Sequence, residues 1–163
     1  MKRPLLILLT TALLATSAAG CGDDDDAMAL RPGEALTEDA NRLVRQLMEI
    51  DFKDRTAPDG APVACSVRSF GAAPEGASNV GQLTTIWAKT VCGAPGPDGM
   101  LGMSMVPVKI TLGGQPELFM PQDGAQYGAD LEKLFPDLGV DLTGEWSEFP
   151  EMRAELEARA AGQ

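Results

Sequence analysis

The sequence predicts an α+β fold in which an N-terminal amphipathic helix packs on a roughly four-stranded antiparallel sheet, followed by short C-terminal helices. Two patterns predict this class. Apolar residues recur at intervals of three and four between residues 40 and 50, and period-two alternation follows between residues 63 and 120. Hairpin-length turns separate the alternating segments, so we expect antiparallel strands with the helix laid across one face of the sheet.

The helix is expected to begin at Thr37, whose side chain can cap a first turn that carries Glu38 and Asp39. Its apolar stripe consists of Ala40, Leu43, Val44, Leu47 and Ile50. The polar residues on its other faces are mixed in sign and lack the basic enrichment of helices that lie on membranes. The stripe therefore predicts packing against the sheet.

Four strand candidates follow the helix, each bounded by residues typical of turns. They cover residues 63–68, 82–92, 106–112 and 117–120. The second candidate carries apolar residues on both faces, as a central strand does. Pro107 in the third candidate cannot donate to a ladder, so this strand should lie at an edge or carry a bulge.

Two short helices are expected near the C-terminus. Residues 129–135 form the first, which Pro136 ends, and Pro150 can occupy the first turn of the second, which runs to about residue 160. The apolar stripe of the last helix, Met152 with Leu156, is thin. That helix could therefore fray, or it could serve as an exposed contact surface.

A helix followed by a four-strand meander resembles the cystatin-like and NTF2-like folds. The resemblance covers roughly residues 35–121 and is one of element order. The inhibitory glutamine-valine-glycine loop of cystatins is missing, because Asn79-Val80-Gly81 matches it only superficially. The resemblance therefore implies a fold, and it carries no catalytic or binding residue into this chain.

Residues 1–20 have the layout of a secretory signal peptide. Lys2 and Arg3 form a basic start, an apolar run covers residues 5–14, and small residues follow. The run is far shorter than the ~20 apolar residues that span a bilayer as a helix. Ala18-Ala19-Gly20-Cys21 then resembles the lipobox of bacterial lipoproteins, with Ala18 where that motif usually carries Leu.

The lipobox resemblance implies that Cys21 becomes the first residue after cleavage and that its thiol receives a diacylglycerol. The alternative is ordinary cleavage near Ala19, which would leave an exposed free thiol in a secreted chain. Residues 21–36 would then be an acidic flexible tether, and residues 37–163 a single globular domain. Four consecutive aspartates in the tether lack the spaced ligands of a calcium loop, which disfavours a calcium role.

The expected location is outside the cytoplasm, on a bacterial membrane that holds the lipid anchor. Gly22 stands at the second mature position, where some lipoproteins carry the aspartate associated with inner-membrane retention. Its identity favours the periplasmic face of the outer membrane.

Assigning Cys21 to lipid leaves Cys65 and Cys92 as an even pair, which should form a disulfide in an oxidising compartment. The alternative is a redox or metal pair. Their long separation, the lack of histidine and the absence of a CxxC spacing disfavour it.

Removing residues 1–20 takes away two of the 13 basic residues and none of the 24 acidic ones, which changes the formal net charge from −11 to −13. No basic patch offsets this charge, so nucleic-acid binding is excluded. We expect the lipid anchor to hold the protein on the membrane. We expect another envelope protein to be its binding partner.

Few residues indicate chemistry. The chain has no histidine, which removes the commonest general base and the usual zinc ligand, and it has no phosphate-binding loop. No metal and no cofactor is expected. The acidic pairs Asp123 with Asp130 and Glu145 with Glu148 could perform acid/base chemistry, although solvated surface carboxylates are the simpler interpretation.

Aromatic residues and methionines give the remaining candidates. A binding surface could be formed by Trp87, Tyr127 and Trp146, with Phe119 as a further aromatic, although core anchoring is their commoner role. Met100, Met103 and Met105 are expected to fill the core, and a methionine-rich contact surface is the alternative.

Two function classes remain. The first is a non-catalytic, membrane-anchored lipoprotein that binds a protein or a small ligand, and the absence of motifs favours it. The second is a histidine-free enzyme that uses carboxylates in a cystatin-like or NTF2-like cavity. A closed cavity with a buried, unpaired carboxylate would indicate the enzyme.

Overall fold

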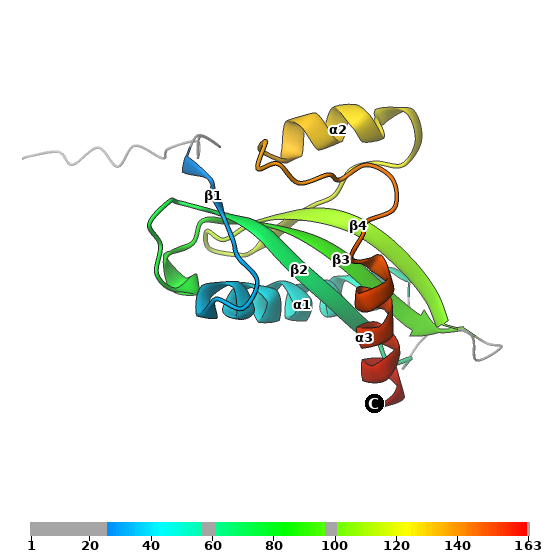
Figure 1. Ribbon diagram of the computed structural model, residues 1–163. Coiled ribbons are helices and arrows are strands. Elements are labelled where there is room, and N and C mark those ends of the chain that lie inside the picture. Colours follow the sequence, from blue (N-terminus) through cyan, green and yellow to red (C-terminus); the bar gives the residue numbers. More distant parts are fainter. Residues whose placement is uncertain (1–25, 57–60, 97–100, 163) are drawn as a thin grey trace, which may run out of the picture.

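The computed structural model describes residues 26–56, 61–96 and 101–162, which form one five-stranded antiparallel sheet with helices on both faces (Figure 1). The strands follow one another across the sheet in chain order: β1 (Met28–Ala29), β2 (Ala64–Ala73), β3 (Thr85–Pro95), β4 (Leu101–Thr111) and β5 (Glu117–Phe119). The helices are α1 (Ala35–Thr56), α2 (Tyr127–Leu134) and α3 (Phe149–Ala161). The predicted α+β class with an antiparallel sheet is confirmed.

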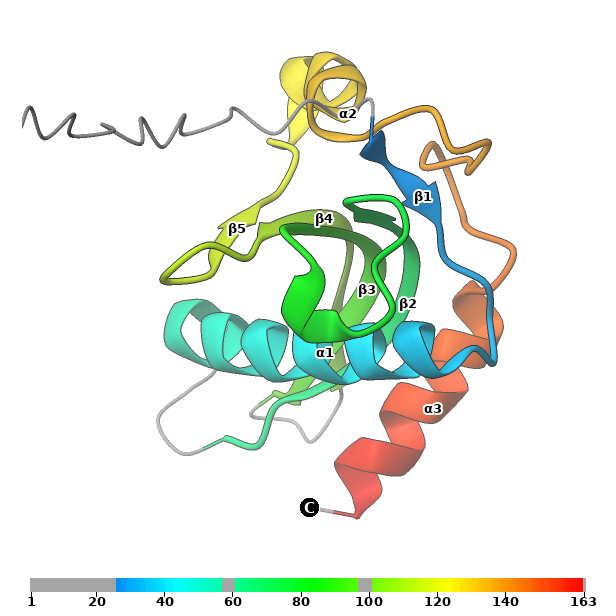
Figure 2. The same ribbon diagram turned by 90° about the vertical axis from the view of Figure 1, so that its left-hand side faces the viewer.

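Helix α1 lies across the concave face of the curved sheet (Figure 2). Ala40, Val44 and Met48 are buried against this face. They lie four residues apart and so form one line along the helix. Ile50, which the sequence placed in the apolar stripe, is 62% exposed. The buried line continues through Met48, and Ile50 lies on the far side of the helix.

The start of α1 differs from the prediction. The helix begins at Ala35, so Thr37 lies inside the first turn, where its hydroxyl donates a hydrogen bond to the Arg31 carbonyl oxygen at 2.8 Å. Gly33, with φ of +83°, reverses the chain just before the helix, a conformation that glycine adopts without strain. Thr37 therefore fastens α1 to the preceding segment and does not cap it.

The folded domain includes part of the expected tether. Met28 pairs with Ala72 of β2, and the Leu30 N–H donates a hydrogen bond to the Phe70 carbonyl oxygen at 3.0 Å. Leu30 is buried. These contacts place the start of the domain before Thr37. Met28 and Leu30 lie beside the edge of β2, where burying their apolar side chains is more favourable in free energy than exposing them to water. Cys21 and the first residues of the tether lie outside the described residues.

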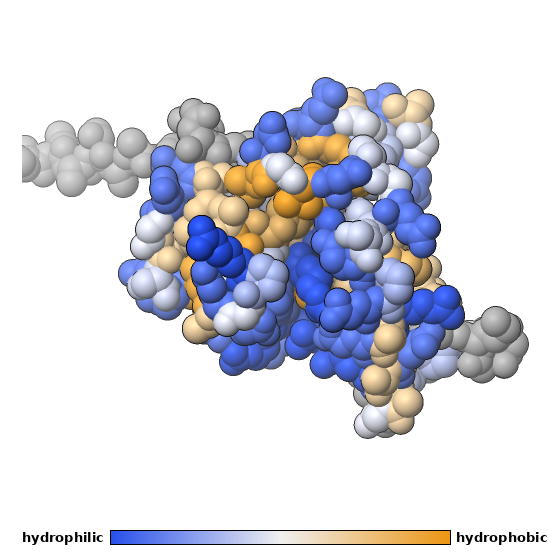
Figure 3. Space-filling model, in the orientation of Figure 1, coloured by the Kyte–Doolittle hydropathy of each residue, from blue (hydrophilic) through white to orange (hydrophobic). Residues whose placement is uncertain are grey.

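The opposite face of the sheet is covered in two parts. Helix α2 and the segment after it cover one end, with Phe70, Trp87 and Phe135 in the shared core, and α3 covers the other end (Figure 1). Figure 3 shows apolar residues gathered beneath α2 on this side of the molecule. Met152 and Leu156 of α3 are fully buried, so their thin stripe docks this helix on the sheet and does not leave it as an exposed apolar contact.

The predicted disulfide is confirmed. Cys65 of β2 and Cys92 of β3 lie directly opposite each other, and their sulfur atoms are 2.05 Å apart. The bridge joins two neighbouring strands beneath α1, where both cysteines are buried in the core.

Candidate functional site

The predicted aromatic surface is not an open surface. Trp87 is 0% exposed and Trp146 is 3% exposed. The Trp87 indole N–H donates to the Leu134 carbonyl oxygen at 2.9 Å, which ties β3 to the end of α2. Both tryptophans act as core anchors, because a large ring on a sheet face is covered as soon as a helix packs above it.

Tyr127 is half-buried beside the Trp87 cluster, and its hydroxyl donates to the Leu142 carbonyl oxygen at 3.5 Å. Burial, and secondarily the charge of Asp123, raises the pKa of the Tyr127 phenol. The three aromatic residues are therefore split between two core clusters and do not form one contact site.

A buried lysine, which the sequence pattern does not reveal, lies on the same face. The Lys89 side chain is 7% exposed, and its Nζ lies 3.2 Å from both carboxylate oxygens of Glu148 and 5.4 Å from the centre of the Trp146 ring. Burial raises the Glu148 pKa, but hydrogen bonds from its own backbone N–H and from Lys89 outweigh burial, so the net pKa is lowered. Glu148 is thus the ionised partner of Lys89.

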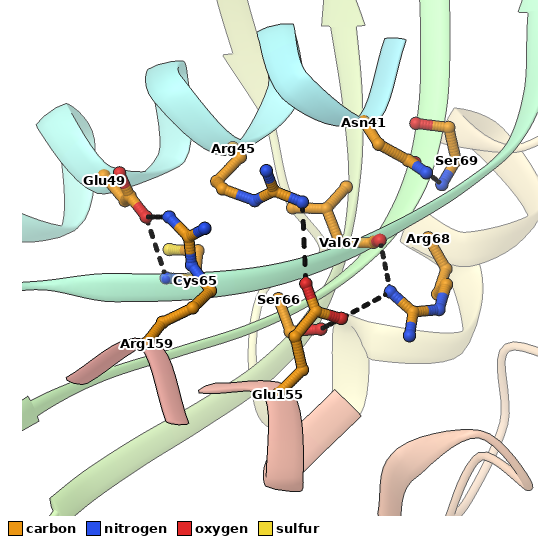
Figure 4. Close-up of polar contacts among 10 residues, drawn as sticks. All are labelled: Asn41, Arg45, Glu49, Cys65, Ser66, Val67, Arg68, Ser69, Glu155 and Arg159. Carbon is orange, nitrogen blue, oxygen red and sulfur yellow. Dashed lines mark hydrogen bonds and ion pairs between the residues drawn. The ribbon is translucent and has the colours of Figure 1, made fainter. Parts of the chain in front are cut away.

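A second polar cluster joins α1 and α3 around the edge of β2 (Figure 4). Glu155 of α3 accepts hydrogen bonds from the Ser66 hydroxyl at 2.9 Å and from Arg68 at 2.8 Å, and Arg45 of α1 lies 3.6 Å from its other oxygen. Burial raises the Glu155 pKa, but these hydrogen bonds and the arginine charges together lower it below its ordinary value. This carboxyl is an ion-pair partner.

Side chains of α1 also satisfy backbone donors on the β2 edge. Glu49 accepts from the Cys65 N–H at 3.1 Å and from Arg159 at 3.0 Å, and Asn41 accepts from the Ser69 N–H at 2.7 Å. Figure 4 shows Asn41 and Glu49 extending from α1, and Arg159 from α3, toward the strand β2. We call Asn41, Glu49 and Arg159 the β2 clasp, because they hold the edge of β2 to α1 and α3.

An open cavity lies beside β4, across the sheet from the β2 edge. It is a groove of about 900 Å³ along the outer edge of β4, with walls from both sides of the sheet. Its lining comprises Met48, Asp51, Phe52 and Arg55 of α1, Cys92, Ser104, Met105 and Val106 of β3 and β4, residues 118–123, and Asp130, Lys133 and Leu134 of α2.

The groove combines apolar surface with charge at its margins. Met105 and Phe119 are each 38% exposed, as is Met103 near the groove, so the expectation that these methionines fill the core is wrong for Met103 and Met105. Met100 lies outside the described residues. Phe119 is the predicted aromatic residue that the structure does place in an open site.

The predicted pair Asp123 and Asp130 lines the same groove. Asp123 is exposed, and Asp130 is half-buried and accepts a hydrogen bond from the Gln122 N–H at 2.9 Å. Arg55 binds Asp51 on the α1 side, and its guanidinium lies 3.7 Å from the Met120 sulfur. These contacts order the margins of the groove and leave it open to solvent.

Among the described residues, no group of histidine, cysteine or acidic side chains could hold a metal ion. Within the same ranges, no helix is long and apolar enough to cross a membrane. The chain matches no known protein family, no curated protein and no solved structure. The fold and the groove therefore define the described part of the chain only as a curved antiparallel sheet with helices on both faces and an open groove beside β4.

Proposed function

We propose that this protein is a membrane-anchored, extracytoplasmic lipoprotein whose domain is a non-catalytic binding module. The groove along β4 carries this proposal, because it presents exposed apolar side chains to solvent at an open site. Exposed apolar groups that line a concave site are typical of binding surfaces. The signal-peptide layout and Cys21 support the anchor.

The paired state of the acidic residues on the α3 side also favours binding over catalysis. Glu148 and Glu155 are engaged by buried or half-buried cations, and their lowered pKa values keep them ionised. A general acid at neutral pH needs a raised carboxyl pKa. The tryptophans that could have lined a catalytic cavity instead fill the core.

Site-directed photocrosslinking in the bacterial envelope tests the proposal. Phe119 in the groove is replaced by p-benzoylphenylalanine in the full-length anchored chain, and Ile50 on the far side of α1 is replaced in a matched control. We expect a discrete light-dependent adduct from the Phe119 position and none from the Ile50 position. Equal adducts from both positions, or none from either, would contradict a binding role for the groove.

The second candidate function, a histidine-free enzyme, is favoured only by Asp123 and Asp130 lining the same groove. Carbon-13 NMR titration of the two carboxyl groups separates the candidates. A carboxyl that titrates near neutral pH would favour the enzyme, and ordinary acidic titration of both would favour the binding module.

A further inference from the structure

We propose that the free edge of β4 inside the groove binds an extended, basic segment of another polypeptide, which adds to the sheet as a strand. This inference rests on the proposed binding function and names the occupant of the groove. Four observations carry it: the direction of the β4 backbone groups, the reason β5 ends, the contrast with the β2 edge, and the charge of the chain.

The β4 backbone presents hydrogen-bonding groups to the groove. The Leu112 N–H donates to the Thr84 carbonyl oxygen at 2.7 Å, which fixes the alternation of paired positions between β3 and β4. Every second residue of β4 counted back from Leu112 therefore directs its backbone N–H and C=O groups toward β3. Met105 and Met103 lie at the alternate positions, so their backbone groups point away from β3. Strand β5 pairs only with residues 109–111, so Met103 and Met105 have no strand partner among the described residues.

Two prolines explain why β5 stops before it covers this edge. Phe119 pairs with Lys109, so continuation of the same register would place Pro121 opposite Pro107. This would be a hydrogen-bonded pair, and neither proline has an N–H to donate. The chain therefore leaves the edge after Phe119. Beyond Pro107, the N–H groups of Met105 and Met103 are again able to pair, but only with a different segment.

The two edges of the sheet are treated differently. On β2, Asn41 and Glu49 accept the outward N–H groups and the β2 clasp covers the edge with charged side chains. Charged residues over an edge are the usual protection against unwanted strand pairing. On β4, the positions with outward backbone groups carry the exposed apolar residues Met103 and Met105. Within the part of the chain that the structure describes, these two β4 positions lack side-chain acceptors like those that Asn41 and Glu49 supply on β2.

An extended segment fits this site better than a helix, because a helix has no free backbone groups to match those of β4. Alternate side chains of an added strand would point to the two walls, toward Met48 and Phe52 on one side and Leu134 on the other. The chain has a formal net charge of −11, and the groove lining holds more acidic than basic side chains: Asp51, Asp123 and Asp130 against Arg55 and Lys133. This charge favours a basic partner and opposes pairing with a second copy.

Three synthetic peptides of about eight residues test the backbone contact. Each alternates valine and threonine with a lysine at both ends; the second is N-methylated at the odd positions and the third at the even positions. We expect the first to shift the amide NMR signals of Met103 and Met105. One methylated peptide should bind about equally well, and the other about tenfold more weakly, because only one set of N–H groups faces β4. Equal binding by both methylated peptides, or no shift with any peptide, would overturn strand addition.

A variant of the protein separates this inference from the proposed function. Met105→Pro removes one N–H group that points away from β3. Position 107 of the same strand faces the same way and already carries a proline, so the fold should tolerate the change. We expect Met105→Pro to weaken binding of the lysine peptide about tenfold. The control is Ile50→Lys, a change at an exposed position of α1 outside the groove, which should leave binding unchanged. If the Phe119 photoadduct persists unchanged in Met105→Pro, the groove still binds a partner and strand addition is wrong.

Two further measurements test the occupant. Replacing the terminal lysines of the peptide by glutamates should weaken binding severalfold, and unchanged affinity would contradict the basic partner. Sedimentation of the unliganded protein should show a monomer. A dimer that Met105→Pro dissociates would assign the edge to a second copy and overturn the proposed occupant.

Discussion

Lys89 and Glu148 form an ion pair across the α3 side of the sheet, with the Lys89 Nζ 3.2 Å from each oxygen of the Glu148 carboxylate. The two ends of the pair differ in exposure, since the Lys89 side chain is 7% exposed and that of Glu148 is 41% exposed. Removing the carboxylate would therefore leave a buried cation, whereas removing the ammonium would leave a carboxylate that water can solvate.

This asymmetry predicts unequal effects of substituting the two residues. Glu148→Ala should lower the free energy of unfolding by about 2 kcal/mol, less than for a fully buried pair because Glu148 is partly solvated. Lys89→Met should cost about 1 kcal/mol or less, because its apolar side chain can pack on Trp146. Urea denaturation measures both, with the exposed Glu145→Ala as the control. A larger loss in Lys89→Met than in Glu148→Ala would contradict this account.

The Glu155 contacts predict a pH-dependent contribution to stability. The Glu155 pKa in the folded protein lies below the ordinary value of a glutamate. The carboxylate therefore stabilises the fold at any pH above that ordinary pKa, and this contribution is lost as the pH falls through the lower pKa of the folded state. Glu155→Gln should therefore cost about 1 kcal/mol at neutral pH and much less near pH ~3.

The matched control for this prediction is Glu157→Gln, which removes an exposed pair with Arg153 on the same helix. It should change stability by at most about 0.5 kcal/mol. Thermal unfolding of both variants and the parent at several pH values provides the measurement. A Glu155→Gln penalty that stays constant with pH would rule out ionisation as its source.

Local patterns predict the class of this fold because the alternation in the strands and the spacing in α1 directly reflect which side chains face the core. They fail where tertiary contacts decide. The sequence pattern does not predict β1, because its two residues form a strand only beside the edge of β2. Ile50 fits the helical spacing, yet the sheet covers the line through Met48.

The groove was harder to predict than the fold, because α1, β4, β5 and α2 contribute residues that are distant in the sequence. Pro107 predicts an edge or a bulge, and among the described residues no strand pairs with β4 at Pro107 on the side away from β3, because β5 pairs only with residues 109–111. The opposition of Pro107 and Pro121 depends on the register of β5, which no short-range pattern specifies. Likewise, the burial of Lys89 depends on Trp146 and Glu148, more than fifty residues away in the chain.

Loss of the disulfide should destabilise the domain without changing its topology. Cys65 and Cys92 are separated by 27 positions, and closing a loop of this size reduces the entropy of the unfolded chain by an amount worth about 3.5 kcal/mol. In a Cys21→Ser background, which leaves this bridge as the only disulfide, reduction should lower the urea midpoint strongly. A reduced protein with an unchanged midpoint would show that packing alone holds β2 to β3.

The proposed lipid anchor gives a prediction that does not depend on the groove. Cys21→Ser removes the thiol that would carry the lipid, while the residues that the structure describes, from Asp26 onward, keep their contacts. We expect the variant to move from the membrane fraction to the soluble envelope fraction and to unfold at the same temperature as the detergent-solubilised parent, because the acyl chains hold the protein on the bilayer but do not pack in its core. Labelling with radioactive palmitate should be lost at the same time. If Cys21→Ser remained in the membrane fraction, the uncleaved apolar run at residues 5–14 would be the anchor, and the lipoprotein assignment would be wrong.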